Sequence, residues 1–225
     1  MDINNKLIRF NQNNLPENFV SIAVQIFEKK PVHAAILIRH NTYNYLHHFP
    51  GSVPPIVMEN FDEDGWYIYK ILDSFNTEDE SEIGSFLQYC KRVCLKSNIT
   101  YSYILDGSHY ENNGEFNSNV GLPELGTCVG FCINTLTNAL IDVEYSLFEL
   151  NDWDNSGLTA SVDEYSLKQV NKKYPDLDWT LYNAFKKRIT PLEYLCSSFF
   201  DNYPIRKTDI ESIKNLVLND IQIKF

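Results

Sequence analysis

The chain has 225 residues, of which 44% are hydrophobic and 22% charged, so it can bury a sizeable core and is not a disordered polymer. It carries 30 Asp and Glu residues against 19 Lys and Arg, a formal net charge of −11. Because binding to a nucleic-acid backbone needs a basic surface, this balance argues against nucleic acid as the main partner.

The N-terminal residues, MDINNKLIRFNQNNLPENF, lack the apolar core of a signal peptide. No apolar run approaches the roughly 18 residues that span a bilayer. We therefore expect a soluble, cytoplasmic protein without a membrane span. Its five cysteines have no spacing typical of a disulfide framework and are expected to be free thiols.

Three strands are predicted at the start of the chain. Residues 20–27 (VSIAVQIF) alternate in character with the period of two that a half-buried strand shows, and residues 32–39 (VHAAILIR) are almost continuously apolar, as in a central strand. A polar link leads to residues 43–49 (YNYLHHF), and the three runs together indicate an antiparallel meander. GSVPPIV, from Gly51, is expected to be a proline-bearing loop.

The middle of the chain mixes one clear helix with weaker signals. Residues 65–72 (GWYIYKIL) are typical of a strand or an apolar bridge. Acidic residues and a helical apolar stripe predict a helix over about 78–96, with Cys90 and Cys94 on its buried face. We expect a solvated helix start from Glu78-Asp79-Glu80, a short strand in residues 99–105 and an irregular connection from there to residue 126.

A second helix is predicted from Cys128 to about Leu140, with Thr127 as its N-cap. After Asp152 the chain is more polar and shows helical stripes in SVDEYSLKQVNKKY, DWTLYNAFKKR, TPLEYLCSSFF and DIESIKNLVLNDI. We expect an α+β fold in which an antiparallel sheet packs against the cysteine-bearing helix. Residues 1–150 would form this core, and residues 151–225 a helical extension packed on the same domain.

Cys128 is the candidate nucleophile of the sequence. In the first turn of a helix its thiolate is favoured by unpaired N–H groups and the positive end of the helix dipole. Cys132 lies one turn deeper, and Cys196 is typical of the core of a late helix. The pairs Cys90/Cys94 and Cys128/Cys132 suit core packing better than structural zinc, so we predict no metal and no cofactor.

A cysteine nucleophile needs an imidazole base, which the fold must bring to it. The candidates are His33, His40, His47, His48 and His109. His33 opens an otherwise apolar strand. If the register permits, His33 and His47 share a face and one ring can orient the other. Since His47 and His48 are neighbours on a strand, one of the two is expected to be a surface residue.

The order of these motifs resembles a known family. A histidine opens one strand (VHAAILI), polar residues end the next (YLHHF), and a cysteine much later begins a helix (GTCVGFCINTL). This resembles the circularly permuted papain-like enzymes, the branch of NlpC-type amidases that includes lecithin retinol acyltransferase-like proteins. The resemblance spans roughly residues 20–140. It implies Cys128 as nucleophile, His33 as general base and His47 or His48 as the orienting third group.

Two hypotheses of different classes follow. The first is a cysteine hydrolase of the peptidase or amidase type, which forms an acyl-enzyme on an amide, isopeptide or ester bond of a peptide, protein or acylated small molecule. The acyl acceptor is water or another nucleophile. The second is a non-catalytic interaction module on the same scaffold, whose acidic surface binds a basic protein partner.

Overall fold

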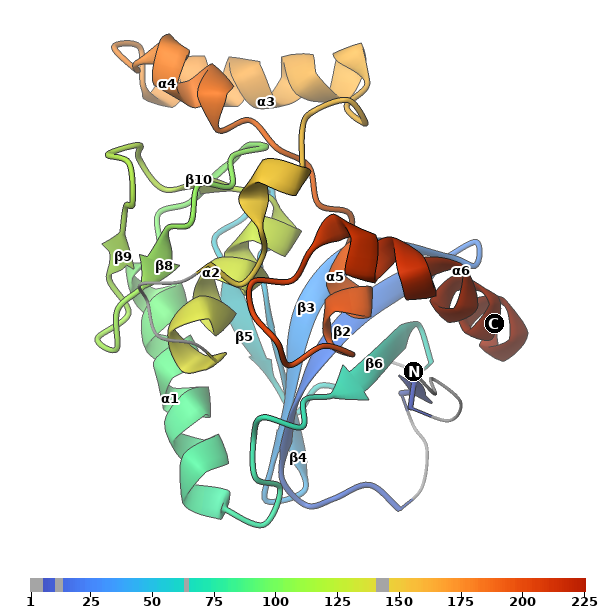
Figure 1. Ribbon diagram of the computed structural model, residues 1–225. Helices are drawn as coiled ribbons and strands as arrows, with labels where there is room; N and C mark the ends of the chain where they lie inside the picture. Colours follow the sequence, from blue (N-terminus) through green and yellow to red (C-terminus); the bar gives the residue numbers. More distant parts are fainter. Residues whose placement is uncertain (1–5, 11–13, 63–64, 141–145) are drawn as a thin grey trace.

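A six-stranded antiparallel sheet forms the centre of the computed structural model, which describes residues 6–10, 14–62, 65–140 and 146–225 (Figure 1). The strand order is β1-β6-β2-β3-β4-β5. The bounds are β1 (Ile8–Arg9), β2 (Phe19–Phe27), β3 (Lys30–His40), β4 (Tyr43–His48), β5 (Ile56–Glu59) and β6 (Tyr67–Ile71). The predicted meander is confirmed, and β3 is a central strand between β2 and β4.

Alternation of side chains along β2 and β3 separates two apolar layers. Val20, Ile22 and Val24 pair with Ile38, Ile36 and Ala34, and all six belong to the main core under the helices. The intervening residues Ala23, Ala35 and Leu37 belong to a second cluster on the opposite face. Both faces of β3 are therefore buried, which explains why its sequence is almost continuously apolar.

Two helices cover the main core. Helix α1 (Glu80–Lys96) begins after Asp79, whose side chain accepts a hydrogen bond from the Glu82 N–H, so the helix starts two residues later than predicted. Helix α2 (Cys128–Leu140) begins at the predicted residue. The Thr127 hydroxyl accepts from the Gly130 N–H at 3.2 Å, which confirms Thr127 as the cap.

Three sequence predictions in the middle of the chain need correction. The proline-bearing segment continues into β5, because Ile56 and Val57 pair with the end of β4. Of residues 99–105, only β7 (Thr100–Tyr101) is a strand, in parallel with β10 (Leu125–Gly126). Beyond Ser102, the backbone of residues 103 and 105 bonds instead to residues 187 and 185 of the C-terminal region. A hairpin of β8 (His109–Tyr110) and β9 (Phe116–Asn117) interrupts the irregular connection.

The C-terminal region is mostly helical, as predicted, and its helices pack in two places (Figure 1). A 3-10 turn η1 (Leu150–Asp152) precedes α3 (Ala160–Lys173), α4 (Trp179–Ala184), α5 (Pro191–Ser197) and α6 (Lys207–Lys224). Helices α5 and α6 complete the main core. Helices α3 and α4 form a separate apolar cluster with residues 104–125. Across the described ranges, no helix is both long and apolar enough to cross a membrane.

Gly114, in the turn of the β8–β9 hairpin, provides a test of how this hairpin is seated. Its φ is +87°, and a Cβ there would lie 2.5 Å from the backbone carbon of Arg92 in α1. Neither the left-handed conformation nor the clash with the Arg92 backbone can be relieved at a small energetic cost. Gly114→Ala should therefore lower the free energy of unfolding by roughly 3 kcal/mol or more. Urea titration followed by circular dichroism measures this loss.

Gly121→Ala is the matched control. Gly121 has a similar φ of +85° but nothing within 4 Å of the added Cβ. Only the cost of the left-handed backbone conformation remains, so Gly121→Ala should lower the free energy of unfolding by about 1 kcal/mol. Equal losses in the two variants would contradict close packing of the hairpin on α1.

Candidate active site

His33 and His48 form a hydrogen-bonded pair at one end of the sheet. In the β3–β4 ladder Ile36 pairs with His47, so His33 and His48 project to the same side. His33 Nε2 lies 2.9 Å from His48 Nδ1, and the rings meet edge to face with centroids 5.1 Å apart. This contact engages Nε2 of His33 and leaves Nδ1 as the ring nitrogen for proton transfer.

His47 points to the other side of the sheet, so the expectation that it shares a face with His33 is wrong. The parity of the register decides this, since antiparallel partners at positions 36 and 47 pair odd with even numbers. His47 is fully buried against α2, with its ring stacked on Phe131 at 4.7 Å between centroids. Its role there is packing within the core.

Hydrogen bonds also hold His47 in place. The Thr135 hydroxyl donates to the Phe131 carbonyl at 2.9 Å, so its oxygen accepts from His47 Nε2–H at 3.1 Å. His47 Nδ1 then accepts from the Cys94 thiol, whose sulfur is 3.3 Å away. Burial lowers the pKa of His47 to about 3 and raises that of Cys94 to about 12, so both groups are neutral. Thr135 is a partner that sequence patterns did not indicate.

Cys128 approaches β3 at an edge rather than across a face. The paired residues of β3 and β4 end at Ile36, so Ala34 and His33 extend beyond the reach of β4. The half-buried thiol of Cys128 lies in this place, with the N–H groups of Ala34, Val129 and Cys128 itself directed at the sulfur. The nucleophile candidate therefore lies beside the residue that follows His33. Among the described residues, His33 hydrogen-bonds to His48 and not to Cys128.

The protonation state of Cys128 differs from the sequence expectation. The three N–H groups favour the thiolate, but burial outweighs them and the pKa of Cys128 is raised. The other four thiols are raised further. Burial brings the pKa of Cys94 and Cys196 to about 12, and that of Cys90 and Cys132 well above its ordinary value. Cys128 remains the most readily ionised thiol of the five, although it rests as a thiol.

The imidazoles at this end of the sheet are neutral as well. Burial, with a smaller contribution from the neighbouring His48, lowers the pKa of His33 to about 4. Burial alone lowers the pKa of His48 to about 4. At neutral pH His33 is therefore an unprotonated base, as proton abstraction requires. His48 Nε2 is buried, and the described residues provide no hydrogen-bond partner for it.

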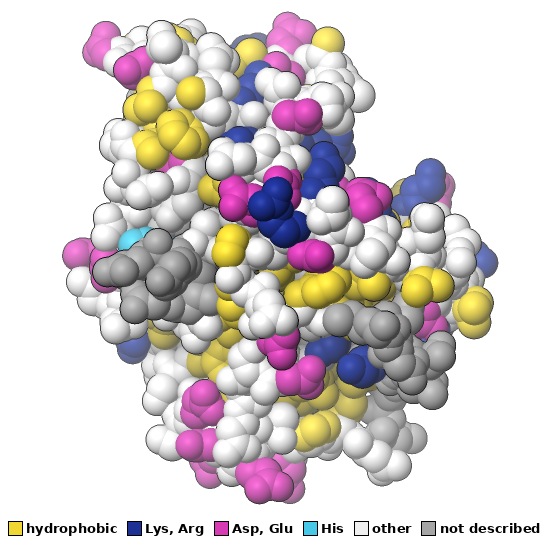
Figure 2. Space-filling model, in the orientation of Figure 1, with side chains coloured by type: hydrophobic (Ala, Val, Ile, Leu, Met, Phe, Trp, Pro, Cys, Tyr) yellow, Lys and Arg dark blue, Asp and Glu magenta, His cyan; other side chains and the backbone are white. Residues whose placement is uncertain are grey.

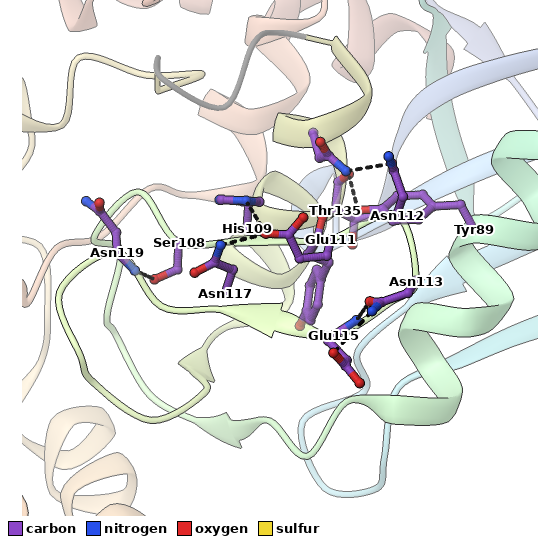
Figure 3. A network of polar contacts seen from close by, with 12 residues as sticks. Tyr89, Ser108, His109, Glu111, Asn112, Asn113, Glu115, Asn117, Asn119 and Thr135 are labelled. Atoms are coloured by element: carbon purple, nitrogen blue, oxygen red, sulfur yellow. Dashed lines mark hydrogen bonds and ion pairs between the residues drawn. The ribbon is translucent and has the colours of Figure 1, made fainter.

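The two remaining histidines lie in other surroundings. His40 Nε2 is 3.9 Å from Glu80 at the start of α1. His109 Nε2 is 3.4 Å from Glu111 within the β8–β9 hairpin, where Asn117 also donates to Glu111 (Figure 3). The hairpin is linked to the core through Tyr89, whose hydroxyl contacts the carbonyls of Tyr110 and Thr135. These contacts give His40 and His109 structural roles outside the candidate active site.

A groove that was not predicted from the sequence is lined by Phe49, which follows His48, and by Tyr101, which pairs with Gly126 just before Cys128. Its volume is about 540 Å³, and its walls are the loop of residues 49–55, residues 97–101 and helix α3. In the described parts of the chain, no cluster of three or more His, Cys, Asp or Glu side chains has the arrangement of a metal site.

Comparison of the chain with protein-family models, curated proteins and solved structures finds no match.

The three buried histidines generate a pH prediction for stability. The unfolded chain protonates them near pH 6.5, whereas in the folded chain their pKa values are about 4, 3 and 4. Their contribution to folding is therefore full above pH 6.5 and is lost as the pH falls toward 4. Each can lower the free energy of unfolding by up to about 1.4 kcal/mol per pH unit within this window.

Urea unfolding between about pH 7.5 and pH 5 measures this dependence. His47→Gln should reduce the pH slope by about one proton, because one buried imidazole no longer titrates. Phe131→Leu disturbs the same packing without removing a titratable group, and should lower the stability while keeping the wild-type slope. An unchanged slope in His47→Gln would show that His47 is not buried in its neutral form.

Proposed function

We propose that the protein is a cysteine hydrolase of the circularly permuted papain-like type, with Cys128 as nucleophile, His33 as general base and His48 as the group that orients His33. The observation that carries this proposal is the His33–His48 hydrogen bond of 2.9 Å, next to Ala34, whose N–H meets the Cys128 sulfur. Of the two candidates for the third group, the register favours His48. The free thiols suit the reducing conditions of the cytoplasm.

In the proposed reaction, His33 Nδ1 takes the Cys128 proton as the sulfur attacks a carbonyl carbon of an amide, isopeptide or ester. His33 Nε2–H donates to His48 Nδ1, which fixes the tautomer with a lone pair on Nδ1. The contact between thiol and imidazole tightens in the substrate complex, as catalytic hydrogen bonds often do. Because both groups rest neutral, the thiolate forms with the attack.

The Cys128 N–H at the start of α2 stabilises the oxyanion of the tetrahedral intermediate. His33 then returns the proton to the leaving group, and an acyl group remains on the Cys128 sulfur as a thioester. Water, or another acyl acceptor, attacks the thioester and gives up its proton to His33. This releases the acyl product and restores the thiol.

The alternative of an interaction module predicts a surface organised for a partner. On the face in Figure 2, Asp and Glu side chains are interspersed with Lys and Arg instead of merging into one acidic patch. Among the described residues, the Arg206 guanidinium donates to both oxygens of Asp152, at 2.8 and 2.9 Å. This face offers a basic partner no continuous acidic surface, so it gives the interaction module no support. The His33–His48 pair, by contrast, supports the hydrolase.

Acylation by p-nitrophenyl acetate tests the hydrolase. We expect a burst of nitrophenolate and an acetyl adduct on Cys128, found by peptide mass spectrometry, at a rate at least roughly ten times that of any other cysteine. Cys128→Ala should abolish the burst. His33→Gln should slow acetylation roughly 100-fold, because it removes the base, and His48→Ala should slow it by a smaller factor.

His40→Gln is the matched control, since it removes an imidazole outside the site and should leave the burst unchanged. Circular dichroism on each variant separates loss of activity from loss of folding. Equal acetylation rates for wild type and a folded His33→Gln variant would contradict the proposed mechanism, and would favour the interaction module.

A further inference from the structure

The groove is lined by residues that lie close to the proposed catalytic groups in the sequence or in strand register. Phe49, one of its lining residues, directly follows His48. Tyr101, another, pairs in register with Gly126, two residues before Cys128. The ring of Tyr101 lies 6.4 Å from that of Phe49. The lining does not include Cys128, His33 or His48, but it contains neighbours of His48 and of the segment before Cys128, and it extends from these neighbours to helix α3.

The charge of the groove is opposite to that of the whole protein. Its lining includes Lys172 and Lys173 and no Asp or Glu, although the chain carries 30 acidic residues and 19 basic ones. The nearby carboxylate of Glu124 is not part of the lining. Its oxygens accept from the Asn98 N–H at 2.7 Å and the Tyr110 hydroxyl at 2.7 Å. A cationic groove in an acidic protein selects ligands of negative charge.

The two lysines have different surroundings. Lys173 Nζ donates to the carbonyl and the side-chain oxygen of Asn98, at 2.7 and 2.9 Å, and so ties α3 to the opposite wall. Lys172 is exposed and has no salt bridge within the described parts of the chain. Lys172 is thus the cation that remains for a ligand.

The other side chains of the groove suit a peptide better than an acyl chain. The ring of Tyr165 lies 6.4 Å from that of Tyr101, which gives the groove an aromatic wall. The groove is also lined by amide and hydroxyl groups that can hydrogen-bond to a peptide backbone, from Ser52, Asn98 and Gln169. A lipid chain in the groove would displace water from these polar groups without forming hydrogen bonds to them. The volume of about 540 Å³ matches a ligand the size of a short peptide segment.

We propose that this groove binds the acyl donor as a short peptide segment, with a carboxylate of that peptide held by Lys172. The inference rests on the proposed function, because it takes Cys128 as the nucleophile that the bound peptide meets. Lys173 holds α3 in position, Lys172 reads the negative charge, and Tyr101 and Tyr165 contact the peptide side chains.

Peptide acyloxymethyl ketones test this specificity. The panel keeps one tripeptide frame and places Glu, Gln or Lys at each position in turn, and mass spectrometry measures the rate of Cys128 alkylation. At one position we expect the Glu probe to react roughly ten times faster than the Lys probe. Lys172→Glu should reverse this preference, so that the Lys probe reacts faster than the Glu probe at that position.

Lys168→Glu is the matched control, because Lys168 is exposed on the same helix but does not line the groove. It should retain the wild-type preference for Glu. Equal rates for Glu and Lys probes at every position, or a preference that survives Lys172→Glu, would overturn the assignment of Lys172. Faster alkylation by a long-chain alkyl ketone than by any peptide probe would overturn the peptide assignment.

A second measurement separates this inference from the proposed function. In the Cys128→Ser variant, fluorescence anisotropy measures binding of a fluorescein-labelled peptide that carries Glu, against its Lys counterpart. Tighter binding of the Glu peptide that is lost in the additional Lys172→Glu variant supports the groove even if Cys128 proves unreactive. No difference between the two peptides overturns the groove assignment, whatever the reactivity of Cys128.

Discussion

The early end of the β3–β4 ladder is the constraint on which the site depends. Beyond Ile36 one edge of β3 has no strand partner, and the start of α2 fills this place with the Cys128 thiol. An unpaired strand edge exposes backbone donors that require a partner. The Ala34 N–H meets this requirement at the sulfur, so a backbone contact places the thiol beside the residue that follows His33. The core beneath α2 fixes the position of the helix itself.

Burial gives this site its electrostatic character. Desolvation keeps Cys128 as a thiol and both His33 and His48 as neutral imidazoles, so no ion pair forms at rest. Burying a neutral thiol and neutral imidazoles costs less free energy than burying separated charges. In the proposed reaction, the charges therefore form only during the attack. Helix N-terminal N–H groups, which sequence position alone suggests as a source of thiolate, act here against a larger desolvation term. In the proposed reaction, these N–H groups would act most strongly on the oxyanion, whose charge develops during attack.

The sequence predicted the strands and helices that periodicity and caps define, and failed where register and tertiary partners decide. Thr127 indicates where α2 begins, and the apolar run of β3 indicates a central strand. The choice between His47 and His48 follows from a register that no local pattern encodes, and the contact of His47 with Thr135 joins residues 88 positions apart. Residues 99–105 form only the two-residue strand β7, because the backbone of residues 103 and 105 bonds to the C-terminal region instead.

The C-terminal region links the core to the groove. Helices α5 and α6 belong to the main core, whereas α3 and α4 pack on residues 104–125. The Tyr182 hydroxyl of α4 also meets the Ser102 hydroxyl at 2.8 Å. Residues 100–126 thus carry both the wall of the groove and the approach to Cys128. A movement of α3 that opens the groove must break the Lys173–Asn98 contacts without disturbing α2. Lys172, on α3, and Cys128, at the start of α2, therefore lie on helices that pack in different apolar clusters.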